Sequence, residues 1–136
     1  MAPAPACILI VEDHNDNRFL MTLLLRNQGY GVVAASSFAE GLSLAQDTNF
    51  DLYLLDDRLG DGCGQELREK LRELHPAIPA LFFTANSYTP DRIDTLRQNG
   101  DDYVLKPSPT DNVLAAVADL LMTSKATRDA ASLNVL

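Results

Sequence analysis

Five polar side chains, widely separated along the chain, are of the types needed to transfer a phosphoryl group onto a carboxylate. They are Glu12, Asp13, Asp56, Thr84 and Lys106. Three carboxylates at one place would repel one another without a counterion, and hard oxygen ligands at an open site suit Mg²⁺ or Mn²⁺. A lysine can pair with a phosphoryl oxygen, and a threonine hydroxyl can donate a hydrogen bond to one. Together these groups could support formation of an aspartyl phosphate.

Each of these side chains lies at or just after the end of a short apolar stretch. We expect strands at residues 7–11, 31–35, 51–55, 80–84 and 102–105. Helical patterns alternate with them at residues 16–28, from the capping Ser37 onward, through Leu67, Leu71 and Leu74, at 90–99 and at 110–122. Strands that alternate with helices pair in parallel, which predicts a doubly wound α/β fold. The expected architecture is a (βα)5 flavodoxin-like three-layer sandwich with sheet order 2-1-3-4-5.

Ligands of such a fold bind outside the carboxyl ends of the strands, so distant strand ends should bring the polar side chains together. Helical spacing also predicts which side chains the helices bury. We expect Leu20 with Leu23 or Leu24 to be buried in the first helix, and the three leucines named above in the third. Ile93 and Leu96 should face the core from the fourth helix.

The composition limits the classes of function. The chain has 136 residues, enough for one domain, with 11 Lys and Arg against 19 Asp and Glu and a net charge of −8. This acidity argues against binding nucleic acid or a membrane surface. Two cysteines outside any C-x-x-C pair, and no apolar run near the ~18 residues of a membrane span, favour a cytoplasmic protein. We expect a disordered lead at residues 1–6, a domain at 7–124 and a fraying tail at 125–136.

Four motifs stand at the ends of the expected strands. They are Ile10-Val11-Glu12-Asp13, Leu54-Leu55-Asp56-Asp57-Arg58-Leu59 with Gly64 closing the loop, Phe83-Thr84-Ala85, and Asp102-Tyr103-Val104-Leu105-Lys106-Pro107. In this order they resemble the response-regulator receiver domain of two-component signalling, the CheY-like family, over residues 7–122.

The resemblance implies a role for each matching position. Asp56 would be the phosphoacceptor, and Asp13, Asp56 and the backbone carbonyl of Arg58 would bind the cation, with Glu12 acting through water. The phosphoryl group would contact the side chains of Thr84 and Lys106 and the backbone N–H of Ala85. We also expect a cis peptide bond between Lys106 and Pro107.

The resemblance also implies a switch. After phosphorylation Thr84 would move toward the phosphoryl group and Tyr103 would turn inward, reshaping the face made by residues 90–99, 102–105 and 110–122. That face could also support a homodimer. Arg58 and Asn86 occupy positions that tune dephosphorylation.

The implied partners are proteins. A sensor histidine kinase, a histidine phosphotransfer protein or a small phosphodonor would supply the phosphoryl group, and a downstream protein would read the result. The chain would catalyse only its own phosphorylation and dephosphorylation.

The acceptor loop departs from the usual pattern. The family often has proline four residues after the acceptor, where this chain has Gly60, so we expect a more flexible loop. Asp57, beside the acceptor, is less usual than an apolar residue, and we expect it to leave the metal site and either meet solvent or contact a helix. Asp56 is preferred as acceptor because Gly64 then follows at the family's spacing of eight residues.

Other functions remain possible from the sequence. A phosphohydrolase of the haloacid-dehalogenase type would need a second aspartate where Arg58 stands. A flavodoxin-like cofactor binder would need a phosphate loop after the first strand, where acidic residues stand instead. A degenerate receiver that only binds partners is disfavoured by the complete residue set. The receiver portion of a larger hybrid kinase or multidomain regulator remains an alternative.

Overall fold

A five-stranded parallel sheet forms the centre of the molecule. The computed structural model describes residues 5–134. The strands are β1 (Cys7–Val11), β2 (Gly31–Ala35), β3 (Leu52–Leu55), β6 (Ala80–Thr84) and β7 (Asp102–Leu105), in the order β2-β1-β3-β6-β7. This confirms the predicted order 2-1-3-4-5, counted over the strands of the large sheet.

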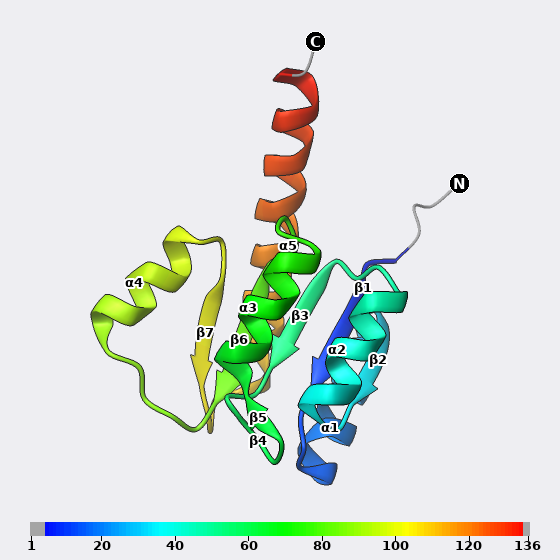
Figure 1. Cartoon of the computed structure of the whole chain (residues 1–136), viewed down its shortest axis with the longest axis vertical. Helices are drawn as coiled ribbons and strands as arrows, with labels where there is room; N and C mark the ends of the chain where they lie inside the picture. The colour runs from blue at the N-terminus through cyan, green and yellow to red at the C-terminus, as the bar shows by residue number, and fades with distance from the viewer. Residues whose placement is uncertain (1–4, 135–136) are drawn as a thin grey trace.

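Helices cover both faces of the sheet, as Figure 1 shows. They are α1 (Asn15–Asn27), α2 (Phe38–Asp47), α3 (Gly64–Leu74), α4 (Pro90–Gln98) and α5 (Thr110–Asn134). Alternate residues of β1 divide the core: Leu9 and Val11 join the cluster beneath α2 and α3, whereas Ile8 and Ile10 join the cluster beneath α1 and α5. Because both faces are covered, the central strands β1 and β3 are apolar along their whole length.

The strand register brings distant strand ends to one edge. Val11 of β1 pairs with Leu55 of β3, and Leu55 pairs with Phe82 of β6. Thr84, the last residue of β6, pairs with Leu105 of β7. The residues that follow these strands therefore meet at the carboxyl edge, which is the lower edge in Figure 1.

Two helices bury different side chains from those expected. In α1 the buried residues are Met21 and Leu25, while Leu20 and Leu23 are 50% and 43% exposed. Leu24, the alternative to Leu23, is partly buried and packs against the core, so the prediction was wrong for Leu20 and Leu23 only. A leucine-rich segment allows several apolar faces. In α3, Leu67 and Leu71 are buried as predicted, but Leu74 at the helix end is 37% exposed.

Helix α5 is longer than predicted. We expected it to end near residue 122 and the following residues to fray, but the helix continues to Asn134 and rises past the amino ends of the strands in Figure 1. Residues 123–134 contain neither glycine nor proline, so nothing in the backbone chemistry ends the helix there. Residues 1–4 of the expected lead and 135–136 of the expected tail lie outside the described residues, and the proposed division into lead, domain and tail stays a prediction.

The segment after Asp56, expected to be a loop, contains a short antiparallel hairpin. Its strands are β4 (Arg58–Leu59) and β5 (Gly62–Cys63). Asp61 fastens this hairpin to α2, because its carboxylate accepts hydrogen bonds from the backbone N–H groups of Phe38 at 2.8 Å and Ala39 at 3.1 Å. A Cβ on Gly62 would lie 2.8 Å from the Phe38 ring, so glycine permits this close approach.

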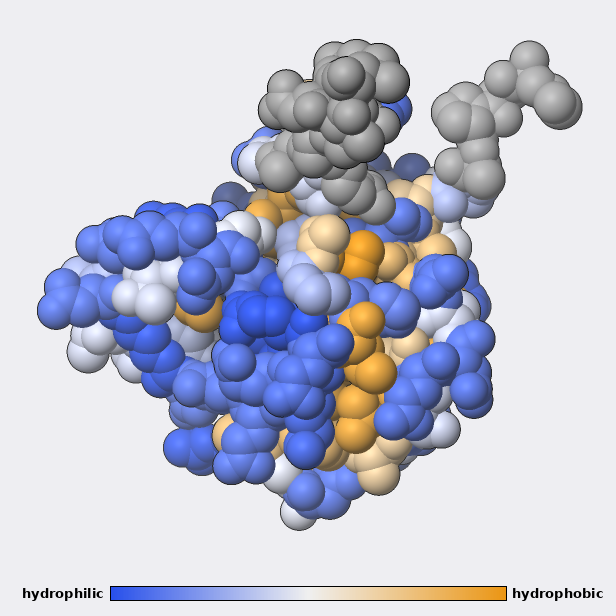
Figure 2. All heavy atoms as spheres, turned by 45° about the horizontal axis from the view of Figure 1, so that its top comes forward, coloured by the Kyte–Doolittle hydropathy of each residue, from blue (hydrophilic) through white to orange (hydrophobic). Residues whose placement is uncertain are grey.

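The surface is largely hydrophilic on the face that Figure 2 shows, where only a narrow hydrophobic strip interrupts the polar side chains. Elsewhere α1 presents its own exposed apolar residues. These are Phe19, Leu20 and Leu23. Over the described part of the chain, no helix is both long and apolar enough to cross a membrane.

Candidate functional site

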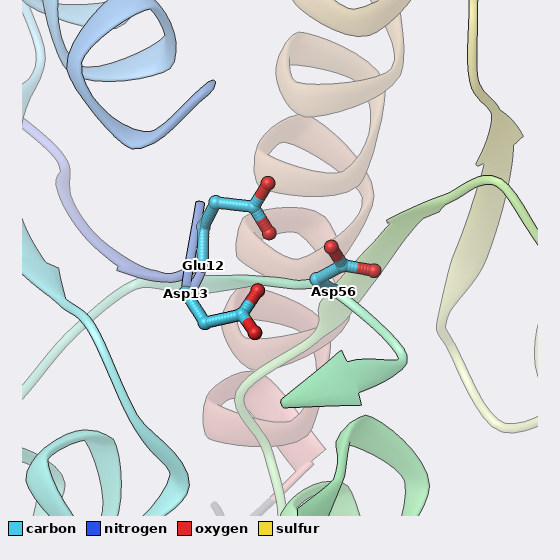
Figure 3. A group of neighbouring side chains, drawn as sticks. All are labelled: Glu12, Asp13 and Asp56. Carbon is cyan, nitrogen blue, oxygen red and sulfur yellow. The ribbon is translucent and has the colours of Figure 1, made fainter. Parts of the chain in front are cut away.

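Three carboxylates meet at the carboxyl edge of the sheet, as predicted. Glu12 and Asp13 follow β1, and Asp56 follows β3. One oxygen from each lies within 4.8 Å of the others, and Figure 3 shows the three side chains converging. Glu12 is buried, Asp56 is partly buried and Asp13 is exposed, so the group opens to solvent on the Asp13 side.

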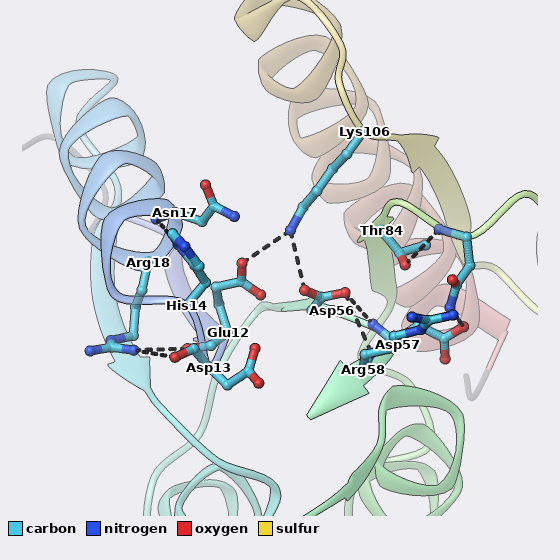
Figure 4. Close-up of polar contacts among 11 residues, drawn as sticks. Glu12, Asp13, His14, Asn17, Arg18, Asp56, Asp57, Arg58, Thr84 and Lys106 are labelled. Atoms are coloured by element: carbon cyan, nitrogen blue, oxygen red, sulfur yellow. Dashed lines mark hydrogen bonds and ion pairs between the residues drawn. The ribbon is translucent and has the colours of Figure 1, made fainter. Parts of the chain in front are cut away.

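Lys106 is the positively charged side chain that contacts these acids. Its Nζ lies 3.0 Å from Glu12 Oε1 and 3.2 Å from Asp56 Oδ2, bridging the two acids (Figure 4). The peptide bond between Lys106 and Pro107 is cis, as expected. One lysine among three carboxylates leaves an excess of negative charge, which a divalent cation can neutralise.

Burial and the contact between Glu12 and Asp56 separate the pKa values of these two acids, whereas Lys106 acts to lower both. The pKa of Glu12 is raised to about 7. Burial is the largest cause, and the upward effect of Asp56 exceeds the downward effect of Lys106. Burial also acts to raise the pKa of Asp56, but contacts with Glu12 and Lys106 and the backbone N–H of Asp57 outweigh it and hold that pKa below its ordinary value. Asp56 therefore stays ionised, the form a nucleophilic carboxylate needs.

The chain around Asp56 is tightly folded. Asp56 Oδ1 accepts hydrogen bonds from the backbone N–H groups of Asp57 at 2.7 Å and Arg58 at 3.5 Å. A Cβ on Gly64 would lie 2.2 Å from the backbone oxygen of Asp56, so only glycine fits eight residues after it. The Arg58 side chain is exposed, and its residue begins the hairpin.

The other predicted site residues also lie along this edge. Thr84 is 1% exposed at the end of β6, and its hydroxyl accepts a hydrogen bond from the backbone N–H of Asn86 at 3.2 Å. Ala85 lines a cavity of about 440 Å³ together with Glu12, Asp56 and Lys106. Of the predicted phosphoryl contacts, Ala85 and Lys106 border this cavity, whereas Thr84 is not among its lining residues.

Tyr103, predicted as part of the switch, and Asn86, predicted to tune dephosphorylation, both contact neighbouring residues. The Tyr103 hydroxyl donates a hydrogen bond to the backbone oxygen of Asn86 at 2.7 Å, and its ring stacks on Tyr88 at 4.3 Å. The Asn86 amide donates to Asp57 Oδ2 at 3.2 Å. Asp57 is 8% exposed and lies 3.8 Å from Arg92 of α4, so contact with a helix is confirmed and a solvated Asp57 is wrong.

Two side chains beside the acidic pair make contacts that were not predicted from the sequence. Arg18 Nη1 donates to the backbone oxygen of Glu12 at 3.0 Å, and its Nη2 donates to Asn15 at 2.6 Å. His14 caps α1 by accepting a hydrogen bond from the backbone N–H of Asn17 at 3.4 Å. Both contacts hold the turn that carries the acids. The position of Arg18, in the first turn of the helix that follows two acids, could have indicated its contact with this turn.

The donor set fits a hard divalent cation. All the candidate ligands are oxygens, and Glu12 Oε2 is buried without a hydrogen-bond partner among the described residues. An acceptor-only oxygen left without a donor suits a cation or a water bound to one.

Comparisons with known proteins agree with this geometry. The family model described as "Response regulator receiver domain" matches residues 8–118. The chain is 31% identical to the transcriptional regulatory protein GlrR of Escherichia coli over 129 residues, which are 95% of this chain and 29% of GlrR. It is 32% identical to the probable transcriptional regulatory protein TcrX of Mycobacterium tuberculosis over 117 residues, which are 86% of this chain and 50% of TcrX.

A solved structure shows the same fold. The CheY-like response regulator receiver domain protein from Methanospirillum hungatei superposes with a TM-score of 0.83 at 28% identity, covering 90% of this chain and 98% of that one. The chain spans half or less of the two curated relatives named above. The order of the strands and the acidic residues at the sheet edge agree with the match to the family model. The chain therefore belongs to the response regulator receiver domain family.

Proposed function

We propose that Asp56 accepts a phosphoryl group and that the chain thereby works as a switch. The observation that carries the proposal is Lys106 Nζ, which lies between Asp56 and Glu12 and within reach of both. Receiver domains act as phosphoacceptor switches, and this chain has an ionised carboxylate in the acceptor position. An Oδ atom of Asp56 forms the bond to phosphorus while the bond from phosphorus to the donor breaks.

The cation site would be formed by Asp13, Asp56 and the backbone carbonyl of Arg58, with Glu12 acting through water. Mg²⁺ or Mn²⁺ bound there would neutralise charge on the phosphoryl oxygens during transfer. Lys106 needs only to exchange a carboxylate oxygen for a phosphoryl oxygen, since Nζ already points to Asp56. Thr84 and the backbone N–H of Ala85 are proposed as the remaining contacts of the phosphoryl group.

The conformational response would pass through the segment after β6. Thr84 Oγ1 holds the N–H of Asn86, and the Tyr103 hydroxyl holds the carbonyl of the same residue. A Thr84 hydroxyl that turns toward a phosphoryl group releases the first of these contacts. The face made by α4, β7 and α5 then shifts between two populated arrangements, and a homodimer or a downstream protein would bind it in one of them.

The partners follow from this chemistry. A sensor histidine kinase or histidine phosphotransfer protein would supply the phosphoryl group from a phosphohistidine, as family membership implies. The curated relatives GlrR and TcrX are described as transcriptional regulatory proteins, and this chain matches only part of each. We propose that this domain controls a separate or attached output by protein contact rather than by binding nucleic acid itself, since its net charge is −8.

The test is phosphorylation by acetyl phosphate in the presence of Mg²⁺, followed by mass spectrometry of the intact protein. The wild type should gain one phosphoryl group, and Asp56→Asn should gain none. Asp57→Asn is the matched control, because it removes the adjacent carboxylate and should still gain the group. No adduct on the wild type, or an unchanged adduct on Asp56→Asn, would reject Asp56 as the acceptor.

A further inference from the structure

Asp57 stands next to the proposed acceptor, but its carboxylate serves a different part of the molecule. Its side chain is largely buried, and its Oδ2 accepts a hydrogen bond from Asn86 Nδ2 at 3.2 Å and lies 3.8 Å from Arg92 Nη2. Asn86 belongs to the segment between β6 and α4, and Arg92 belongs to α4. One carboxylate oxygen therefore holds the acceptor strand, that segment and the helix together.

Asn86 is fixed on three sides by residues of the site. Its backbone N–H donates to Thr84 Oγ1 at 3.2 Å, its backbone oxygen accepts from the Tyr103 hydroxyl at 2.7 Å, and its amide donates to Asp57. The first two contacts place the residue beside the phosphoryl site, and the third turns its side chain to Asp57. Figure 4 shows Asp56 and Asp57 directed to opposite sides of the chain.

Two aromatic rings pack beside the contact between Asp57 and Arg92. The Arg92 guanidinium lies 3.6 Å from the centre of the Tyr88 ring, which is 7% exposed. Tyr88 stacks in turn on Tyr103 with ring centres 4.3 Å apart. The arginine, held over the ring, places a positive charge beside Asp57 on its outer side.

We propose that Asp57 is a positioning residue that slows hydrolysis of the phosphoryl group on Asp56 by keeping the Asn86 amide away from the attacking water. The inference rests on the proposed function. In hydrolysis a water oxygen forms a bond to phosphorus, the bond between phosphorus and Asp56 Oδ breaks, and inorganic phosphate leaves with the carboxylate restored and a proton released to solvent. If Asn86 Nδ2 lost its contact with Asp57, the side chain could turn, and its amide oxygen could then accept a hydrogen bond from that water and orient it for attack.

The experiment compares rates of phosphate loss in four proteins. Wild type, Asp57→Ala, Asn86→Ala and the double variant are phosphorylated with acetyl phosphate and Mg²⁺, freed of donor and followed by intact mass. We expect Asp57→Ala to lose the group about fivefold faster than wild type, within the range of coupling between residues in contact. In the Asn86→Ala background, removing Asp57 should change nothing. Asp91→Ala, which removes an exposed carboxylate from the same helix as Arg92, should match wild type.

Each result decides the inference. An equal acceleration in both backgrounds would show that the lost charge alone matters and would overturn it, as would an unchanged or slower rate in Asp57→Ala. If Asp57→Ala does not fold, as judged by circular dichroism, Asp57→Val fills more of the space and also removes both carboxylate oxygens, so it should accelerate in the same Asn86-dependent way. A wild type that takes up no phosphoryl group would instead reject the proposed function, and the inference with it.

Discussion

Two clusters of charged side chains stand at opposite edges of the same sheet, and they are neutralised differently. At the amino edge Asp101 accepts hydrogen bonds from Arg68 Nε at 3.0 Å and Nη2 at 2.9 Å, from Arg72 at 3.0 Å and from the backbone N–H of Ala80 at 2.9 Å. Both of its oxygens are satisfied, and Arg68 and Asp101 are 3% and 2% exposed.

At the carboxyl edge, three carboxylates share one lysine, and the buried Glu12 Oε2 has no partner among the described residues. In the first cluster, Arg68 and Arg72 balance the charges of Asp101 and Glu69, although Arg68 Nη1 is buried without a hydrogen-bond partner among the described residues. This cluster holds α3 against the start of β6 and β7. The second is short of positive charge, which is typical of a site that waits for a cation. The two clusters therefore differ in net charge: the amino-edge cluster is balanced, as a structural cluster can be, whereas the carboxyl-edge cluster has an excess of negative charge, as a cation site would have.

The largest expected effect comes from breaking the amino-edge cluster. Asp101→Ala should lower the free energy of unfolding by about 3–5 kcal/mol, because it leaves a buried arginine without its partner. Urea denaturation measures the change. Glu69→Gln removes only the exposed partner of Arg72 and should cost less than about 0.5 kcal/mol. Equal stability of Asp101→Ala and wild type would contradict a structural role for this cluster.

At the carboxyl edge the expected effect is on cation binding rather than stability. Asp13→Asn should weaken binding of Mn²⁺ about tenfold, measured by isothermal titration calorimetry, because it removes a proposed ligand. Its unfolding free energy without cation should stay level or rise, since one like charge is gone. Asp119→Asn makes the same charge change at an exposed position of α5 and should leave the affinity unchanged. If Asp13→Asn were less stable than wild type, the carboxyl-edge acids would also stabilise the fold, and the two clusters would not differ in function.

The raised pKa of Glu12 predicts a pH dependence at the carboxyl edge alone. The ordinary pKa is 4.5 and the folded value is about 7, so the folded state binds this proton more tightly than the unfolded state. In the absence of cations, stability should therefore fall by about 1 kcal/mol as pH rises from about 5 to 8. The pKa of Asp56 lies below its ordinary 3.8, outside this window.

Urea denaturation in EDTA at both ends of the window tests the effect. Glu12→Gln cannot titrate, so its stability should fall less over this range, and both histidines are common to the two proteins. The same fall in wild type and Glu12→Gln would place the titrating group elsewhere.

Sequence alone predicted the sheet and the meeting of its strand ends. Apolar stretches that each end in a polar residue are sufficient for this, because parallel strands place their carboxyl ends at one edge. The partners of Asp57 and Asp101 were not predicted, since each contact joins residues at least 21 positions apart and depends on how helices pack. Hydrophobic periodicity and secondary-structure propensity do not predict such long-range side-chain contacts. The prediction that Leu20 and Leu23 are buried in α1 was wrong for a related reason, because only packing against the sheet selects among the apolar stripes of this helix.

The smallest expected effect concerns the hairpin that carries a proposed ligand of the cation, the carbonyl of Arg58. Asp61 ties this hairpin to α2, and the two backbone N–H groups lower the pKa of its carboxyl, which stays ionised at neutral pH. Asp61→Ala should weaken Mn²⁺ binding about threefold by loosening the hairpin, less than the loss of a direct ligand.

Ser37→Ala is the matched control for this effect. It removes the other side-chain cap of α2, where Ser37 Oγ accepts a hydrogen bond from the backbone N–H of Glu40 at 3.1 Å, and leaves the hairpin tied. Both variants should lower the thermal midpoint, because each removes a cap from the same helix. Only Asp61→Ala should lose cation affinity. Equal affinities for the two variants would mean that the hairpin holds its shape without Asp61, and that the carboxyl edge is positioned by the strands alone.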